Sequence, residues 1–162
     1  MSVFVKGKVI HTKRLVMRKP NIEDVDQLYN ILKKEAVGQW LAKSRGMSID
    51  ETKDYMSQLI LHWEQYDFGV WLLFKNETGE TEIMYLLDSE YWRNGYASEA
   101  AEASIQYATE TMNLKRIIAR VKVANENSKK LLRKLGFTYT QDVDHSGRLL
   151  SYFELNTSSD GL

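Results

Sequence analysis

The spacing of apolar residues changes several times along the chain, and it predicts two amphipathic helices in the first half. Between residues 21 and 32 apolar side chains recur at intervals of three and four, the spacing of one helix face, and Asn21 is a favoured N-cap residue. Ser48 and Glu51 form a capping box, in which each side chain hydrogen-bonds the backbone N–H of the other residue. The helix predicted behind this box has a stripe of four apolar residues: Met56, Leu59, Ile60 and Trp63.

Short runs of apolar and β-branched residues separate the helices, and they predict strands. The first run ends before Pro20, which cannot continue a central strand because it has no backbone N–H. The turn-forming segment 144–147 predicts a hairpin near the end of the chain. The predicted strands cover residues 14–18, 68–74, 83–87 and 117–123, and the hairpin strands cover residues 137–143 and 149–155.

Two later helices complete the predicted order of elements. An alanine-rich helix runs from about residue 97 to residue 112, and a helix over residues 128–135 is ended by Gly136 in a left-handed C-cap. Strands and helices in this order predict a mixed α/β domain with one sheet. The single proline and the lack of linker-like segments indicate one domain over residues 1–162, with a polar tail at 156–162 that we expect to fray.

Composition excludes several classes of protein. Lys plus Arg equals Asp plus Glu at 22 each, so no net charge attracts the chain to nucleic acid or to an anionic membrane. The apolar runs are too short to cross a bilayer and the first residues show no secretory signal, which together predict a cytoplasmic protein. The absence of cysteine excludes disulfides and thiol catalysis, and the three scattered histidines show no metal-ligand spacing.

The most informative stretch, residues 85–98, reads as a strand, a short turn at Gly95 and a helix that begins at once. Backbone N–H groups from Arg93 to Ser98 are then expected to be unpaired at the positive end of the helix dipole, an arrangement that binds phosphate. The alternative is an ordinary strand–turn–helix junction with an incidental glycine. The stretch lacks a G-x-G-x-x-G motif and a Gly-rich run before Lys-Ser/Thr, so it matches neither a Rossmann fold nor a P-loop.

A second group of polar residues lies about thirty positions further on. Asn125 and Ser128 are three residues apart at a predicted strand-to-helix junction, so each is a candidate ligand contact and equally a candidate N-cap. Residues 113–134 contain eight basic residues and one acidic residue. That composition suits a phosphate-rich ligand, although a solvated helix face is its commoner meaning.

Taken together, these segments resemble the GNAT superfamily of acetyl-CoA-dependent N-acetyltransferases, most closely its ribosomal-protein N-terminal (Rim-type) branch. The likeness covers nearly the whole chain in the right order. It rests on TKRLVMR at 12–18, the helix start at 23–25, FGVW at 68–71, EIMY at 82–85, YWRNGYA at 91–97, NENS at 125–128 and KLGF at 134–137. The resemblance implies a GNAT-type α/β (α+β) fold, with a mixed, mostly antiparallel single sheet flanked by about four helices.

The resemblance also implies where acetyl-CoA binds. In the family a glycine-containing turn wraps the CoA pyrophosphate, and here Trp92 takes its first place, as is common in this branch. The strand before the turn opens so that pantetheine pairs with its backbone, and Asn125 contacts pantetheine or the thioester, while Lys130 reaches a CoA phosphate. The implied cofactor-binding residues of the strand and the turn are Tyr85, Leu86, Leu87, Arg93, Asn94, Gly95, Tyr96, Ala97 and Ser98. No metal is implied.

For the reaction itself the family uses direct attack of a neutral amine on the thioester, so a missing cysteine is no obstacle. Many members use a tyrosine on the last helix as the acid, but Leu132 stands at that place here. Ser128 is then the candidate that stabilises the departing sulfur by a hydrogen bond, with capping as its alternative role. Glu82 is the candidate base, directly or through a water, and its alternative is a solvated glutamate.

One departure from the family pattern concerns the middle of the sheet. A further strand and turn normally separate the strand at 68–74 from the strand that begins near Glu82, so about a dozen residues are missing. Losing one strand of an antiparallel meander reverses the direction of one flank. Either the N-terminal strands are rearranged, giving a sheet one strand short, or the sequence omits a segment.

The function predicted on this basis is N-acetyl transfer from acetyl-CoA to a primary amine. The acceptor classes left open are a protein N-terminus, a polyamine, an aminoglycoside and other small amines. The alternative is a CoA-binding sensor or interaction module that keeps the fold without transfer, which Leu132 and the missing strand favour somewhat. Nucleic-acid binding through residues 113–134 is a weaker alternative that the zero net charge opposes. Dimerisation is compatible with this fold and is not readable from the sequence.

Overall fold

The computed structural model describes residues 4–6, 9–66, 73–75, 81–83 and 88–157, which fall into two compact units. The first unit comprises residues 1–71 and 85–100, and the second comprises residues 72–84 and 101–162. The boundary lies inside helix α4 (Tyr96–Gln106), which therefore belongs to both units.

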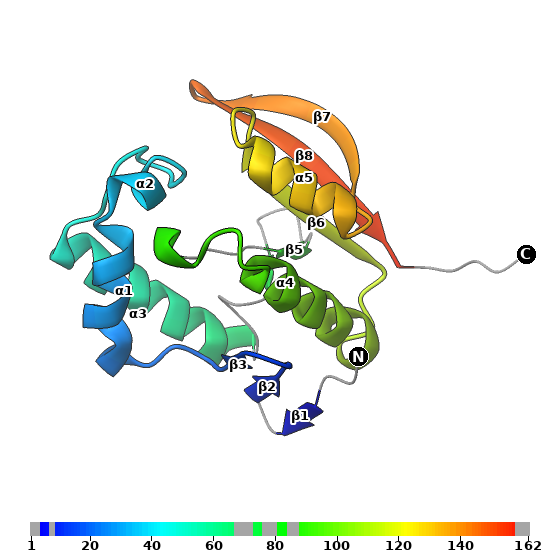
Figure 1. Ribbon diagram of the computed structural model, residues 1–162, viewed down its shortest axis with the longest axis horizontal. Helices are drawn as coiled ribbons and strands as arrows, with labels where there is room; N and C mark the ends of the chain where they lie inside the picture. Colours follow the sequence, from blue (N-terminus) through cyan, green and yellow to red (C-terminus); the bar gives the residue numbers. More distant parts are fainter. Residues whose placement is uncertain (1–3, 7–8, 67–72, 76–80, 84–87, 158–162) are drawn as a thin grey trace, which may run out of the picture. The chain divides into compact units, whose positions relative to one another are not determined.

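The first unit combines a small sheet with a group of helices. Its three strands are antiparallel neighbours in the order β1-β2-β3, and helix α1 crosses the long helix α3 (Figure 1). The core of this unit includes Ile10, Leu32, Met56 and Trp63, all buried. The elements are β1 (Phe4–Lys6), β2 (Val9–His11), β3 (Val16–Met17), η1 (Ile22–Asp24), α1 (Val25–Leu32), α2 (Glu35–Gly38), α3 (Ile49–Tyr66) and η2 (Ser89–Tyr91).

Both predicted N-caps of this unit are confirmed. Asn21 accepts a hydrogen bond from the N–H of Glu23 at 3.2 Å, and the side chain of Asp24 accepts one from the N–H of Asn21 at 2.8 Å. Ser48 and Glu51 exchange the two bonds of a capping box, at 3.2 Å and 2.9 Å, at the start of α3. The helix begins where the sequence predicts because these two side chains satisfy N–H groups that have no acceptor within the helix.

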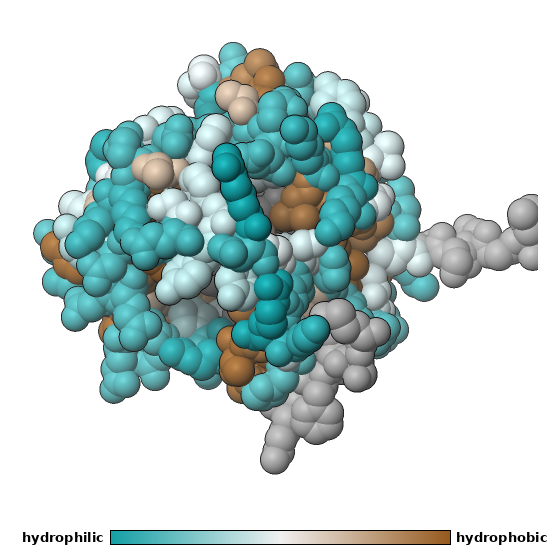
Figure 2. Space-filling view, in the orientation of Figure 1, coloured by the Kyte–Doolittle hydropathy of each residue, from teal (hydrophilic) through white to brown (hydrophobic). Residues whose placement is uncertain are grey.

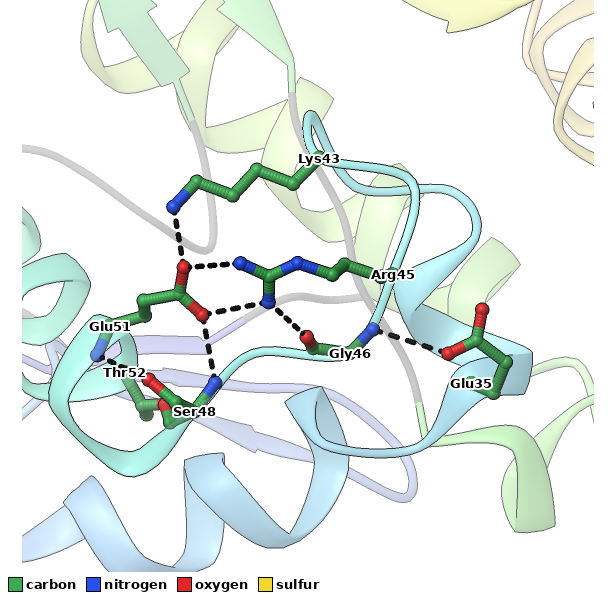
Figure 3. A network of polar contacts seen from close by, with 7 residues as sticks. All are labelled: Glu35, Lys43, Arg45, Gly46, Ser48, Glu51 and Thr52. Atoms are coloured by element: carbon green, nitrogen blue, oxygen red, sulfur yellow. Dashed lines mark hydrogen bonds and ion pairs between the residues drawn. The ribbon is translucent and has the colours of Figure 1, made fainter.

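Glu51 also holds the loop that precedes α3 (Figure 3). Its carboxylate accepts bonds from Arg45 at 2.7 and 2.9 Å and from Lys43 at 2.5 Å, besides the N–H of Ser48. Hydrogen bonds from Arg45 first, and then from Lys43, hold the pKa of Glu51 far below its ordinary value. A single acidic side chain thus fixes both a helix start and the path of the loop before it.

The second unit contains a five-stranded sheet in the order β4-β5-β6-β8-β7. Neighbouring strands are antiparallel except β5 and β6, which run parallel. Helix α5 packs against β6 and β7 (Figure 1). The elements are β4 (Leu73–Lys75), β5 (Thr81–Ile83), the π-helical turn η3 (Tyr107–Thr111) that continues α4, β6 (Arg116–Lys122), α5 (Glu126–Lys134), β7 (Thr138–His145) and β8 (Arg148–Asn156).

Local turn chemistry explains the ends of these elements. Gly136 follows α5 with φ +90°, the left-handed conformation predicted for its C-cap. Ser146 and Gly147, with φ 55° and 85°, form a two-residue turn between β7 and β8, as the predicted hairpin requires. Leu132, Phe137 and Phe153 are buried in the core of this unit.

The α+β fold with mostly antiparallel strands and about four helices is confirmed, but the single sheet is not. The described strands form two sheets, and no ladder among the described residues joins β3 to β4. Within the described residues, β4 pairs directly with β5 in antiparallel register. The predicted strand segments 68–72 and 84–87 lie outside the described residues.

Three element boundaries also differ from the prediction. The alanine-rich helix is α-helical only to Gln106, after which η3 widens to a π-helical turn. Helix α5 begins at Glu126 rather than at residue 128, because Asn125 is its N-cap. Ordered structure extends into the tail that we expected to fray, since the N–H of Thr157 donates to the carbonyl of Lys115 at 2.9 Å; residues 158–162 lie outside the described part.

On the face drawn in Figure 2 hydrophobic residues form small separate patches within hydrophilic surroundings. In the described ranges, no helix combines the length and apolar composition needed to cross a bilayer.

Candidate functional site

The turn that the sequence singles out lies between η2 and α4, in the first unit. Trp92 ends η2 with an extended backbone, Arg93 has φ 64° and Gly95 has φ 78°, and α4 begins at Tyr96. Two residues in the left-handed region within three positions turn the chain sharply, and the second of them is a glycine, which adopts this conformation without strain. The predicted strand–turn–helix geometry is therefore present in its turn and helix parts.

The backbone N–H groups of this turn have the property that anion binding requires. The first hydrogen bond of α4 runs from the N–H of Glu99 to the carbonyl of Gly95, at 3.0 Å. Elsewhere in the described part of the chain, no acceptor meets the N–H groups of residues 93–97. N–H groups without an acceptor at the positive end of a helix dipole attract a negatively charged group.

Three ion pairs made by two basic residues, none of which was predicted, hold the residues around the turn. Lys34 donates to Asp88 at 2.7 and 2.8 Å and to Glu90 at 2.9 Å, while Asp88 caps η2. The hydrogen bond from Lys34 lowers the pKa of Asp88, and that same bond raises the pKa of Lys34. The approach to the turn is thereby tied to the start of α2, 54 residues earlier in the chain.

Arg14 is the second of these basic residues, and it pairs with Glu99 in the first turn of α4. The Nε of Arg14 donates to Glu99 at 2.6 Å, and its Nη1 donates to the carbonyl of Asn94 at 2.8 Å. Glu99 is buried, and its pKa is lowered first by the hydrogen bond from Thr12 and then by those from Arg14. The only sequence signal for this pair is the segment TKRLVMR, which carries part of the family resemblance but does not reveal its partner.

In the second unit Asn125 and Ser128 lie together at the start of α5. The side-chain oxygen of Asn125 accepts a hydrogen bond from the N–H of Ser128 at 3.1 Å, so the N-cap alternative is confirmed for Asn125. That bond uses the oxygen of the amide and leaves its NH₂ group as a donor. Lys130 is exposed on the same helix.

Glu82 occupies the middle position of β5, in the interior of the second unit's sheet. Its backbone pairs with Phe74 of β4 and with Ile118 of β6, the parallel neighbour. The three predicted pantetheine contacts Tyr85, Leu86 and Leu87 lie outside the described residues. The structure thus brings residues 93–98 together in one turn, and Asn125, Ser128 and Lys130 together on one helix; the two sets belong to different units.

A shallow hollow of about 220 Å³ on the second unit's sheet was not predicted. It is smaller than a usual small-molecule pocket, and none of the predicted site residues lines it. Among the described residues, no group of three His, Asp or Glu side chains is placed to hold a metal ion. The lining residues of the hollow are Arg116, Ile118, Thr140, Gln141, Tyr152, Phe153 and Glu154.

Comparison with known proteins shows the family to which this chain belongs. A family model described as an acetyltransferase (GNAT) domain matches residues 14–138, which include the turn, α4 and all of α5. The chain belongs to the GNAT acetyltransferase family. Members of this family use acetyl-CoA, and the chain is a GNAT N-acetyltransferase.

Curated relatives and solved structures agree with this membership. The uncharacterized N-acetyltransferase p20 of Bacillus licheniformis is 28% identical over 146 residues, covering 80% of this chain and 82% of that protein. The uncharacterized N-acetyltransferase YnaD of Bacillus subtilis is 30% identical over 137 residues, covering 78% of this GNAT chain and 81% of its own length.

Two solved structures share the fold. A GNAT-family acetyltransferase from Bacillus anthracis superposes with a TM-score of 0.76 at 20% identity, covering 91% of this chain and 98% of the other. RimL, a ribosomal L7/L12 α-N-protein acetyltransferase solved in complex with coenzyme A, superposes with a TM-score of 0.72 at 16% identity, covering 98% and 100%. Likeness at these identities shows the GNAT fold and leaves the acceptor open.

Proposed function

We propose that this GNAT enzyme transfers acetyl from acetyl-CoA to a primary amine, either a protein N-terminus or a small amine, and that the turn before α4 binds the CoA diphosphate. The observation that carries the proposal is the row of N–H groups at residues 93–97, which meet no acceptor in the described structure. A diphosphate offers several anionic oxygens to such a row. The left-handed conformations of Arg93 and Gly95 support the fit, because they bring backbone rather than side chains toward the ligand.

The remaining cofactor contacts are assigned from the resemblance. Ser98 lies in the first turn of α4 and extends the row of residues around the diphosphate. Tyr85, Leu86 and Leu87 pair through their backbones with pantetheine, the amide NH₂ of Asn125 donates to pantetheine or the thioester carbonyl, and Lys130 contacts a CoA phosphate. The capping bond of Asn125 supports its part, since the bond fixes the side chain while leaving a donor for the ligand.

In the proposed reaction the amine nitrogen attacks the thioester carbonyl carbon while the carbon–sulfur bond breaks. Glu82 accepts the proton that the amine loses, directly or through a water, and Ser128 donates a hydrogen bond to the departing sulfur. Ser128 lies in the first turn of α5, where the helix dipole stabilises developing negative charge. Leu132, which stands where many members have a tyrosine acid, has a hydrocarbon side chain and is fully buried, so this position supplies no proton donor. Positioning of the two substrates supplies much of the acceleration.

The Rim-type branch supports a protein N-terminus as the first acceptor to examine. The segments TKRLVMR and YWRNGYA carry the likeness to that branch, and the fold shared with RimL is compatible with it. The acceptor panel is therefore a peptide with a free N-terminus, the same peptide with a blocked N-terminus as its control, a polyamine and an aminoglycoside.

The test has two steps on the wild-type protein. Thermal unfolding with acetyl-CoA, CoA or ATP is expected to show stabilisation by the first two only, because a ligand that binds the native state raises the melting temperature by mass action. Release of free thiol from acetyl-CoA is then measured with each amine. Turnover on at least one primary amine is the expected result. CoA binding without turnover on any amine contradicts the proposal and favours the sensor alternative.

A further inference from the structure

The geometry points to Arg14 as a positioning residue for the cofactor: through the carbonyl of Asn94 and the carboxylate of Glu99, it sets the direction and the electrostatic environment of the N–H row at residues 93–97. This inference rests on the proposed function, because it concerns how the turn before α4 binds a diphosphate. Arg14 acts through its partners and is not assigned a contact with the ligand.

The bond from Arg14 to the turn fixes one peptide plane. Arg14 Nη1 donates to the carbonyl oxygen of Asn94 at 2.8 Å, and its guanidinium lies 4.4 Å from the centre of the Tyr96 ring. In a trans peptide the C=O of one residue and the N–H of the next point in opposite directions, and the described residues contain no cis peptide. Holding the Asn94 carbonyl toward Arg14 therefore turns the N–H of Gly95 away from Arg14, where it is available to a ligand.

A glycine at position 95 favours this packing. A Cβ added to Gly95 would lie 3.2 Å from Nη2 of Arg14, closer than ordinary van der Waals contact, and the residue has φ 78°. The guanidinium and the turn are therefore in direct contact, with no side chain of residue 95 between them. The stacking on Tyr96 adds a cation–π contact at the first residue of the helix.

Arg14 also neutralises a charge that would otherwise oppose the cofactor. Glu99 lies in the first turn of α4, so its carboxylate is close to the helix end at which we place the diphosphate. Its side chain is only 7% exposed. The carboxylate accepts bonds from the side chain of Thr12 and from both the N–H and Nε of Arg14, at 2.5, 2.7 and 2.6 Å. Without the guanidinium, a partly buried negative charge would remain next to an anion site and would weaken phosphate binding.

The two roles predict a specific pattern among variants. Arg14→Ala, and Arg14→Met as a second variant that keeps part of the apolar stem, are expected to raise the Kd for CoA about tenfold, the effect of losing a charge-assisted hydrogen bond. Adding Glu99→Gln to Arg14→Ala is expected to recover part of that loss, because it removes the uncompensated charge. Arg18→Ala is the matched control: Arg18 makes a bidentate pair with Asp24 in the same unit, at 2.7 and 2.6 Å, and has no contact with the turn in the described structure.

The deciding measurement compares two acetyl donors, acetyl-CoA and S-acetylpantetheine, which lacks the diphosphate, on the amine that the wild type acetylates. We expect Arg14→Ala to raise KM for acetyl-CoA about tenfold, with kcat and the rate with S-acetylpantetheine within about twofold of wild type. A general folding defect would lower both rates together, and that result overturns the inference. Unchanged Kd and KM for the CoA donors in both Arg14 variants overturns it as well.

Failure of the inference and failure of the proposed function are distinguishable in the same titrations. A wild type that does not bind CoA removes the proposed function and this inference with it. A wild type that binds CoA, together with Arg14 variants that bind equally well, removes the role of Arg14 alone.

Discussion

At the residue scale, several loops of this protein are held by single carboxylates that each accept several hydrogen bonds. Glu51, Asp88 and Glu99 each join a loop to a helix start, and in each the hydrogen bonds lower the pKa of the carboxyl group. An ionised carboxylate accepts several donors at once, so one residue can fix a segment that has few apolar contacts. Each of these groups therefore stays charged to a lower pH than an ordinary carboxyl group of its type.

Glu51 provides a pH test of this role. Its pKa is lower in the folded than in the unfolded chain, so its contribution to stability is present above about pH 4.3 and is lost as the pH falls toward the folded-state pKa. We expect Glu51→Gln, which keeps a capping side chain, to lower the free energy of unfolding at pH 7, and the difference from wild type to narrow below about pH 4. Urea unfolding at a series of pH values measures this difference.

Asp50→Asn is the control for that series. Asp50 is a highly exposed neighbour whose ion pair with Lys53 is 3.8 Å long, so its replacement is expected to change stability little at any pH. A Glu51→Gln difference that stays constant from pH 7 to pH 3 would show that the Glu51 charge contributes nothing.

Asn125 tests whether one side chain both caps a helix and binds the cofactor. Asn125→Ala is expected to destabilise the fold by about 1 kcal/mol, whereas Asn125→Ser keeps a capping oxygen and is expected to remain close to wild type. Both variants lose the amide NH₂ donor, so both are expected to reduce kcat/KM for acetyl-CoA, by about tenfold. Steady-state kinetics beside urea unfolding separate the two effects, and a fully active Asn125→Ser would limit the residue to capping.

At the scale of elements, the sequence predicts those features that depend only on residues close together in the chain. The caps at Asn21 and Ser48, the turn at Ser146 and Gly147, and the left-handed Gly136 all depend on residues a few positions apart, and the structure has each of them. The pairings that hold the candidate site join distant positions. Arg14 and Glu99 are 85 residues apart, and no periodicity of either segment indicates the partner of the other.

The role of the glycine turn before α4 can be tested by comparing Gly95→Ala with Gly147→Ala, a control variant in a different turn. Gly95→Ala and Gly147→Ala both place a side chain at positive φ, 78° and 85°, which costs about 1–2 kcal/mol of stability at either position. Only at position 95 does the new Cβ meet a neighbour, Arg14 Nη2 at 3.2 Å; at position 147 nothing lies within 4 Å. We expect similar losses in the free energy of unfolding, but weaker CoA binding, by about tenfold, only for Gly95→Ala.

Calorimetric titration with CoA checks this pair of variants. Equal CoA affinity in Gly95→Ala and Gly147→Ala would mean that the turn does not contact the cofactor, whatever the change in stability.

At the scale of the whole molecule, the sequence predicts the family and its chemistry better than it predicts which strands pair in the sheets. The segments predicted to bind the cofactor are each continuous in sequence, so residues 91–97 and 125–128 could be recognised one by one, and the family model confirms the GNAT family that they indicate. The sheet depends on which strands pair, and that depends on strands far apart in the chain. Local sequence patterns do not reveal these pairings, and the two sheets among the described strands are visible only in the hydrogen-bonded ladders.

The backbone amides of residues 93–97 are the core of the account, and they can be observed directly. In a ¹⁵N-labelled sample titrated with CoA, we expect the largest amide shift changes at these five residues, because their N–H groups gain phosphate acceptors, while the amides of Ser146 and Gly147 stay unchanged. CoA that binds with no change at residues 93–97, or that does not bind at all, would contradict the account.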